Sequence, residues 1–328
     1  MPTISTSDLA RIAPAIDPST LELIILPTEQ CNFRCTYCYE DFVVGRMKPH
    51  TVEAVKRLIA RRSESLSSLS LSWFGGEPLL AKDVVLSVSG YAAERALNSK
   101  SKLKYSASIT TNAYLLDEEL FRKLVDVGVR HYQITLDGPA AVHDRTRRRA
   151  AGGGTFDRIW TNLLMMKDSS LPFTVTLRLH FTTESLDLLP PLLADIRTVF
   201  LPDSRFTPAL HEVKRHGGAN DWMITPMTSE QRDQAELHLN RLLGTSFDER
   251  DSSGYICYAA RANSLLIRAD GTIGKCTVAL SDSRNAIGHI NDDGTLHLLQ
   301  QRVGPWLRGI ATLDPLALEC PLAGMPPE

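Results

Sequence analysis

Short apolar runs alternate with longer amphipathic stretches along the first two-thirds of the chain. The runs have the length of buried β-strands, and the stretches between them carry apolar residues at helical spacing. The predicted strands are Leu21–Leu26, Leu69–Phe74, Tyr105–Thr110, His131–Leu136, Phe173–Phe181 and, with a weaker pattern, Glu212–His216. The predicted helices are His50–Glu64, Lys82–Leu97, Asp117–Val127, Phe156–Met166 and Glu184–Phe200, the last broken or restarted at Pro190 and Pro191.

Strand–helix alternation of this kind predicts an α/β fold in which helices cover a parallel sheet. Rolling such a sheet gives a full or partial barrel, here a partial (β/α)6 TIM-like barrel over residues 21–220. Active sites of these barrels lie at the C-terminal ends of the strands. Side chains that directly follow a predicted strand are therefore the first candidates for chemistry.

The pattern changes after about residue 220. Ser229–Leu243 is predicted as one more helix. Ala262–Arg268 and Thr272–Thr277, joined by a three-residue turn, have the signature of a β-hairpin, and Asp292–Gly294 marks a second turn. We therefore divide the chain into an N-terminal segment (1–20), the barrel (21–220) and a C-terminal region (221–328) made of a helix and a small extension.

Composition narrows the class of partner. The 328 residues are 43% hydrophobic and 23% charged with a formal net charge of −2, so no overall field points to nucleic acid or to an anionic membrane. The N-terminal stretch lacks the regions of a secretory signal, and no apolar run is long enough to cross a bilayer. We therefore expect a cytoplasmic protein. The most basic stretch, Arg145–Arg149, is either a solvated face or a site for an acidic peptide or a carboxylate.

Three of the six cysteines lie within eight residues, at Cys31, Cys35 and Cys38, soon after the first predicted strand. Disulfides are rare in a reducing cytoplasm, so these thiols are candidates for metal binding or catalysis. Three thiolates in one loop can hold three corners of a cubane iron–sulfur cluster and leave the fourth iron open. An open coordination position distinguishes a catalytic metal centre from a structural one.

Two simpler interpretations fit this loop less well. Structural zinc takes four ligands in paired knuckles, but no fourth Cys or His lies within ten residues of Cys38. Three free cysteines of a hydrophobic core are disfavoured by the polar residues between them, which are Asn32, Arg34, Thr36 and Tyr37.

Further motifs follow the later strands in order. They are Trp73-Phe-Gly-Gly-Glu-Pro78, Ile109-Thr-Thr-Asn112, Ile134-Thr-Leu-Asp-Gly-Pro139 with His143-Asp144-Arg145, Gly153-Gly-Thr-Phe-Asp157 and Leu177-Arg-Leu179. Together with C-x3-C-x2-C and the aromatic residue before its third cysteine, this series resembles the radical S-adenosylmethionine (SAM) superfamily. The likeness is to the branch that modifies peptides and proteins, and it covers about residues 21–185.

The resemblance implies an enzyme with a 4Fe–4S cluster held by Cys31, Cys35 and Cys38. The fourth iron would bind the amino nitrogen and carboxylate of SAM. An electron from an external donor of the flavodoxin or ferredoxin type would then cleave SAM reductively to a 5′-deoxyadenosyl radical. That radical would take a hydrogen atom from the substrate.

The same resemblance implies a set of SAM-binding residues. Tyr37 would present backbone atoms to the adenine, and the carbonyl groups of Gly75 and Gly76 would accept from the ammonium group. Glu77 either anchors that loop or meets the ammonium directly. The remaining candidates, for the carboxylate or ribose or else for ordinary barrel packing, are Asn112, Thr135 and Arg178.

The last three cysteines form a second group. Cys257 and Cys276 with Gly271 make a C-x13-G-x4-C pattern that resembles the opening of the auxiliary-cluster extension called SPASM, or its shorter relative called Twitch. The dense run of further cysteines is missing, since only Cys320 remains. Three interpretations stay open: one auxiliary 4Fe–4S cluster on these three cysteines, a degenerate domain without a cluster, or a truncated chain.

The favoured function is that of a RiPP-type maturase, which crosslinks, epimerises or oxidises a side chain of a ribosomal peptide or small protein. The alternatives are an enzyme for a small metabolite, formylglycine formation as in sulfatase maturation, and a binding module without catalysis. Thr277 stands where sulfatase-maturing relatives carry aspartate, and the intact first triad argues against a mere binding module. About twenty residues precede the first strand, too few for a leader-binding domain, so we expect the barrel, the C-terminal region or a separate protein to recognise the substrate.

Overall fold

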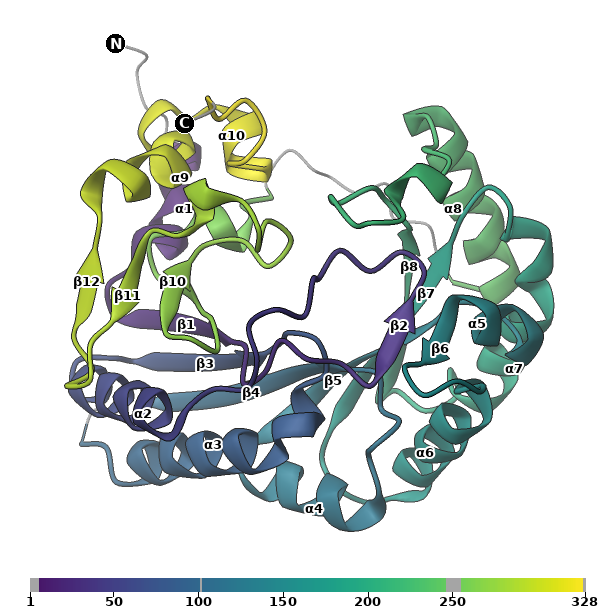
Figure 1. Cartoon of the computed structure of the whole chain (residues 1–328), viewed down its shortest axis with the longest axis horizontal. Coiled ribbons are helices and arrows are strands. Elements are labelled where there is room, and N and C mark those ends of the chain that lie inside the picture. The colour runs from purple at the N-terminus through teal and green to yellow at the C-terminus, as the bar shows by residue number, and fades with distance from the viewer. Residues whose placement is uncertain (1–5, 101, 246–254, 327–328) are drawn as a thin grey trace.

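The computed structural model describes residues 6–100, 102–245 and 255–326 (Figure 1). Its main sheet has the strand order β12-β11-β10-β9-β1-β3-β4-β5-β7-β8. Six strands that run parallel to one another form the barrel: β1 (Thr20–Ile25), β3 (Ser68–Trp73), β4 (Lys104–Thr111), β5 (Val129–Leu136), β7 (Thr174–Phe181) and β8 (Phe206–Glu212). The predicted α/β fold with a partial TIM-like barrel is confirmed.

Helices cover the convex, outer face of this curved sheet (Figure 1). They are α2 (Pro49–Ser63), α3 (Lys82–Leu97), α4 (Glu118–Asp126), α6 (Phe156–Asp168), α7 (Pro190–Val199) and α8 (Ser229–Leu243). Shorter elements lie in the connections, namely η1 (Pro78–Ala81), α5 (Ala140–Thr146), η2 (Leu186–Leu188) and η3 (Asp221–Met223). No helix in the described ranges is both long and apolar enough to cross a membrane.

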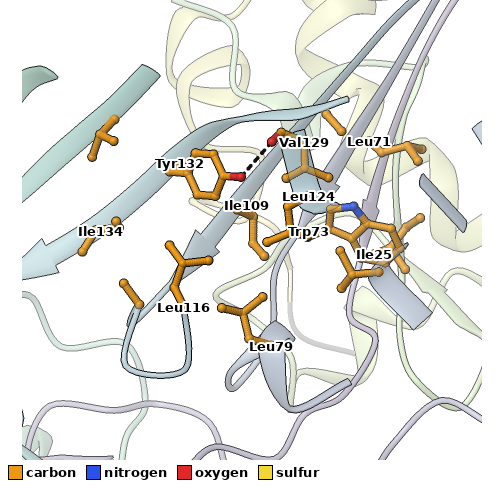
Figure 2. Packing of buried hydrophobic residues seen from close by; sticks show 14 of the residues in the cluster. Ile25, Leu71, Trp73, Leu79, Ile109, Leu116, Leu124, Val129, Tyr132 and Ile134 are labelled. Carbon is orange, nitrogen blue, oxygen red and sulfur yellow. Dashed lines mark hydrogen bonds between the residues drawn. The ribbon is translucent and has the colours of Figure 1, made fainter. Parts of the chain in front are cut away.

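The core lies between the helices and the outer face of the sheet (Figure 2). The polar atoms of two large buried side chains are hydrogen-bonded. Trp73 Nε1 donates to Ser89 Oγ at 3.0 Å, and Tyr132 Oη donates to the Val129 carbonyl at 2.9 Å. Burying one such side chain stabilises the fold by about 2–3 kcal/mol. The core thus fixes the strand ends on which the site depends.

The concave face of the sheet is polar and partly open. Along β3 the side chains alternate between buried apolar and half-buried serine, and the pattern continues on the next strands. Parallel sheets normally bury both faces under apolar residues. Here one face instead carries half-buried hydroxyl, amide and cationic groups, among them Ser70, Ser72, Ser108, Thr110, Gln133, Thr176 and Arg178.

One predicted element differs from the structure. The sixth strand is Phe206–Glu212 instead of Glu212–His216. Pro208 lies within this strand and interrupts the residue pattern by which strands are predicted. Proline is tolerated there because β8 is an edge strand. The predicted break at Pro190 and Pro191 is present, since η2 ends at Leu188 and α7 begins at Pro190, where the first turn needs no backbone N–H.

The C-terminal region extends the same sheet. The predicted hairpin is present as β9 (Ser264–Ile267) and β10 (Thr272–Gly274), and β9 also pairs in parallel with β1. β11 (Gly288–Ile290) and β12 (Leu296–Leu298) continue the sheet. Three helices without a predicted counterpart accompany them, α1 (Thr6–Ile16), α9 (Gln300–Thr312) and α10 (Pro315–Glu319). Ile12 of α1 and Leu318 of α10 share a small apolar cluster.

Candidate functional site

The first cysteine group lies in the segment between β1 and α2, which crosses the concave side of the barrel (Figure 1). Part of this segment is a short strand, β2 (Phe33–Cys35), that pairs antiparallel with β6 (Arg147–Arg149). The Met47 amide donates to the Pro27 carbonyl at 2.9 Å and closes the segment at its base. The cysteines are therefore held by backbone hydrogen bonds from two sides.

The three thiols line one cavity of about 150 Å³ at the C-terminal ends of the strands. Of the residues that the sequence predicts to bind SAM, five share this cavity with Cys31, Cys35 and Cys38: Tyr37, Gly75, Gly76, Asn112 and Thr135. Glu77 and Arg178 do not line it. No three Cys, His, Asp or Glu side chains in the described residues are arranged to hold a single metal ion.

Burial and local donors set the chemistry of these thiols. Burial raises the pKa of all three thiols, to about 11 for Cys38, and the neighbouring thiols add to the rise at Cys31 and Cys38. The Phe33 amide donates to Cys31 Sγ at 3.3 Å, and Asn112 Nδ2 lies 4.0 Å from the same sulfur. N–H donors aimed at sulfur are a means by which proteins tune iron–sulfur clusters, so the donor set fits such a group. Binding a cluster here releases the thiol protons.

The Gly75-Gly76 pair is required by close packing. Gly75 has a φ of +112°, and a Cβ on it would collide with the Thr28 carbonyl. A Cβ on Gly76 would collide with the Gln30 carbonyl. The two glycines thus let the loop after β3 approach the cysteine segment, and the Glu77 amide donates to the Gln30 carbonyl at 2.9 Å.

Glu77 is fully buried and its carboxylate is occupied by the chain itself. Oε1 accepts from the Leu79 amide at 2.9 Å and from Thr111 Oγ1 at 2.7 Å, and Oε2 accepts from the Asn112 amide at 2.7 Å. Burial raises the pKa of Glu77, although these three donors oppose the shift. Asn112 Nδ2 then donates to Asn32 Oδ1 at 2.8 Å, which links Glu77 to the cysteine segment.

Arg178 lies on the concave face of β7, in register with Thr135 of β5. Its Nε atom is buried without a hydrogen-bond partner. Burial lowers the pKa of Arg178, while the phenols of Tyr39 and Tyr37 lie close enough to raise it. Such an orphaned donor beside the cysteine cavity is suited to an anionic ligand group.

A buried polar network behind the cysteine segment escaped the sequence analysis. Tyr37 Oη donates to Asp137 Oδ1 at 2.9 Å and accepts from the Arg147 guanidinium at 2.8 Å. His180 Nδ1 lies 3.1 Å from the same hydroxyl and 3.3 Å from Asp137 Oδ1. Burial would raise the pKa of Asp137, but the His180 hydrogen bond and the Arg147 charge hold it well below its ordinary value. The network fixes Tyr37 between Cys35 and Cys38.

The basic stretch divides into two roles. Arg147 is buried and serves the internal carboxylate of Asp137, whereas Arg145, Arg148 and Arg149 are exposed. The three exposed arginines agree with a solvated face, whereas Arg147 belongs to the protein interior. The polar positions of β7 were the available signal for the network, since a buried strand of a parallel sheet seldom alternates in this way.

The second cysteine group gathers near the first. Burial raises the pKa of Cys257, and the nearby Cys276 and Cys320 add to this rise. Burial also raises the pKa of Cys276, and Cys320 adds to it. Backbone amides donate to Cys257 and Cys276 as they do in the first group. Tyr258 packs on the apolar cluster that includes Phe74, a residue of the first cavity. Thr277 Oγ1 lies 2.7 Å from the Tyr258 hydroxyl.

The fold and these sites define the class of the protein. Residues 25–193 match the family model of the radical SAM superfamily, which is more than half of the chain. The chain belongs to this superfamily and is an enzyme whose cofactors are a 4Fe–4S cluster and SAM. The predicted resemblance to the radical SAM superfamily is thereby confirmed.

The curated relatives have names that describe different enzyme activities. The chain is 26% identical to a protein named "Probable GTP 3',8-cyclase" from Methanocaldococcus jannaschii, over 65% of this chain and 67% of the relative. It is 28% identical to the cysteine-type anaerobic sulfatase-maturating enzyme of Clostridium perfringens, over 47% of this chain and 43% of that enzyme. The chain thus spans less than half of the sulfatase-maturating enzyme.

Solved structures share the fold. The enzyme anSMEcpe with bound AdoMet and the Kp18Cys peptide superposes with a TM-score of 0.65 at 19% identity, covering 87% of this chain and 80% of that one. SuiB of Streptococcus suis bound to its precursor peptide SuiA gives a TM-score of 0.60 at 16% identity, covering 92% of this chain and 69% of that one. At these identities the likeness establishes the fold alone.

Proposed function

We propose that this enzyme abstracts a hydrogen atom from a peptide or small-protein substrate, as the first step of a crosslink, an epimerisation or an oxidation. The half-buried polar side chains on the concave face carry this proposal. A polypeptide drawn into a barrel needs partners for its backbone amides, and the hydroxyl and amide groups along β3, β4 and β5 supply them. The peptide-bound structures of anSMEcpe and SuiB support it.

In this proposal Cys31, Cys35 and Cys38 hold the cluster, which with SAM supplies the 5′-deoxyadenosyl radical. The chain's own residues orient the cofactor. Gly75 and Gly76 bring backbone carbonyl groups to the cavity, and Asn112, Thr135 and the backbone of Tyr37 line it. Arg178, in register with Thr135, places its positive charge next to this cavity for the carboxylate of SAM.

The geometry favours anchoring as the role of Glu77. Both carboxylate oxygens already accept from Leu79, Thr111 and Asn112. A direct bond to the SAM ammonium would have to displace one of these buried donors, which costs about 1–3 kcal/mol. Glu77 therefore acts through the position of Asn112.

An auxiliary 4Fe–4S cluster on Cys257, Cys276 and Cys320 is part of the proposal. Support comes from their mutual proximity and from the backbone amides that point at two of the sulfurs. Replacing all three with alanine should remove about half of the iron bound per chain and leave SAM cleavage measurable. Iron content equal to that of the parent would exclude the cluster.

The electron donor is proposed to be an acidic protein of the flavodoxin or ferredoxin type. The β2–β6 ribbon carries the ligand Cys35 and exposes Arg34 and Arg148, which are paired in register. Positive charge beside a cluster steers an acidic redox partner to it. An electron would then enter next to a cluster ligand.

A small-metabolite enzyme stays the second candidate, because the Methanocaldococcus relative is named a GTP cyclase. One experiment separates the two candidates. The enzyme is reconstituted with iron and sulfide without oxygen, then reduced with SAM and either GTP or peptides encoded beside its gene. Mass spectrometry should show a peptide that has lost hydrogen, or gained deuterium in heavy water, while GTP is unchanged. Conversion of GTP alone would refute the proposed substrate class.

A further inference from the structure

A second cavity of about 320 Å³ lies beside the cofactor cavity, and the two share Tyr37 as a wall. Its walls come from the ends of β5, β7 and β8, from α5 and from η3. Met223 is 56% exposed, so the cavity opens to solvent on that side. Most of the cavity surface is apolar, formed by Val142, Phe181, Val213, Met223 and Ile224.

The charged side chains that line this cavity are all acidic. They are the carboxylates of Asp137 and Glu184, and no lysine or arginine of the described ranges is part of the lining. The imidazole of His180 adds no positive charge, because burial lowers its pKa. The cavity therefore combines apolar walls with negative charge.

The two carboxylates differ in what already surrounds them. Asp137 is buried and accepts from the hydroxyl groups of Tyr37 at 2.9 Å and Thr146 at 2.7 Å. The nearby positive charge of Arg147 stabilises its ionised form. Glu184 is exposed, and none of the cationic side chains that the structure describes forms an ion pair with it. Glu184 is therefore the carboxylate whose charge remains unbalanced.

The carboxylate of Glu184 is held at the mouth of the cavity. The hydroxyl groups of Thr225 and Thr182 donate to it and lower its pKa, so it is ionised at neutral pH. Thr182 lines the cavity, and Thr225 directly follows the wall residue Ile224. Both donors thus belong to the rim, and they keep the negative charge next to the apolar wall.

We propose that this cavity binds a basic side chain of the substrate, lysine or arginine, with its aliphatic stem on the apolar wall and its cationic end at Glu184. Such a side chain is apolar along its length and charged at its tip, as the cavity requires. An unbalanced carboxylate selects a cation over an anion. The shared Tyr37 wall places the adjoining part of the substrate beside the cofactor cavity. The assignment to a side chain of the substrate rests on the proposed peptide function.

The test compares two probes on the cluster-loaded enzyme with SAM, by calorimetry without oxygen. Nα-Acetyl-lysine N-methylamide carries the cationic end, and Nα-acetyl-norleucine N-methylamide has the same stem without the amino group. We expect the lysine probe to bind roughly 3- to 5-fold more tightly at low salt. A cavity that offers only apolar contacts would prefer the norleucine probe. Equal binding of the two probes, tighter binding of norleucine, or binding of neither would overturn the proposal.

Two charge variants locate the cationic end. Glu184→Gln keeps the size of the side chain and removes its charge, so the preference for the lysine probe should disappear. Asp187→Asn removes an exposed carboxylate on η2 that does not line the cavity, and this matched control should keep the preference. A Glu184→Gln enzyme with the preference of the parent would refute the contact.

Cavity-filling variants locate the stem. Val213→Phe should weaken binding of the lysine probe at least roughly tenfold, because the new ring occupies the same space. Ile224→Phe is the second variant in case the first does not fold. Leu188→Phe adds the same ring on the exposed η2 outside the cavity and serves as the matched control. Undiminished binding of the lysine probe by a folded filling variant would refute the site.

Probe binding requires neither turnover nor a peptide. A failure of the lysine probe to bind therefore counts against the cavity and leaves the proposed peptide chemistry intact. Conversely, an enzyme that acts on GTP alone but binds the lysine probe through Glu184 would keep the site and refute the assignment to a peptide side chain.

Discussion

Substitution of Glu77 tests how the site is held together. In Glu77→Gln the amide oxygen can keep the bonds from Leu79 and Thr111, but the amide nitrogen then faces the Asn112 N–H. One buried donor loses its partner, which should lower the free energy of unfolding by about 1–3 kcal/mol. Glu77→Ala leaves all three donors without a partner and creates a void. We therefore expect the free energy of unfolding to fall by roughly 3–6 kcal/mol.

The assay is urea unfolding of the cluster-free chain, with iron content measured on the reconstituted enzyme. The midpoint should fall in the order parent, Glu77→Gln, Glu77→Ala at an unchanged slope. Glu118→Gln changes an exposed carboxylate on α4 and should stay within about 0.5 kcal/mol of the parent. Iron retention should fall with stability, because Glu77 positions Asn112 against the cysteine segment.

The anchoring role would be refuted by a specific pattern. If Glu77→Gln unfolds at the midpoint of the parent and holds the same iron, but binds SAM much more weakly, the carboxylate contacts the cofactor directly. The hydrogen bonds to Leu79, Thr111 and Asn112 would then contribute little to the site.

Three further predictions concern a glycine, a surface and a buried imidazole. Gly75→Ala should cost roughly 2 kcal/mol more in urea unfolding than Gly152→Ala, since both have positive φ but only Gly75 has a carbonyl in the way. Arg34→Glu with Arg148→Glu should raise the KM for a flavodoxin roughly 3- to 10-fold and leave the dithionite-driven rate unchanged. Burial lowers the pKa of His143 from 6.5 to about 4. Between pH 6.5 and 4 the unfolded chain therefore binds a proton at His143 that the folded chain does not bind. The free energy of unfolding should fall by about 3 kcal/mol over this range, and by less in His143→Asn.

The sequence predicts the barrel well because its strands are strongly patterned and its helices are amphipathic. Leu69–Phe74 lies within one residue of β3, and Ser229–Leu243 coincides with α8. Errors arise where distant contacts decide the structure. The pairing of β9 with β1 joins segments more than 200 residues apart, and no local pattern encodes it.

The candidate site was predictable where a single segment carries the signal. The cysteine spacing and the Gly75-Gly76 pair place residues that line one cavity. The network of Asp137, Arg147 and His180 was not predictable in this way, because each side chain comes from a different element. The sequence around Arg147 does not distinguish it from its exposed neighbours. Arg147 is buried only because β6 directs its side chain inward.

The central claim is that three thiols of one loop hold a cluster with an iron open to SAM. The most direct measurement is the yield of 5′-deoxyadenosine after anaerobic reduction of the parent enzyme and of a variant with Cys31, Cys35 and Cys38 all replaced by alanine. We expect the parent to form 5′-deoxyadenosine and the variant to form none. Equal yields from the two proteins, or no product from the iron-loaded parent, would contradict the claim.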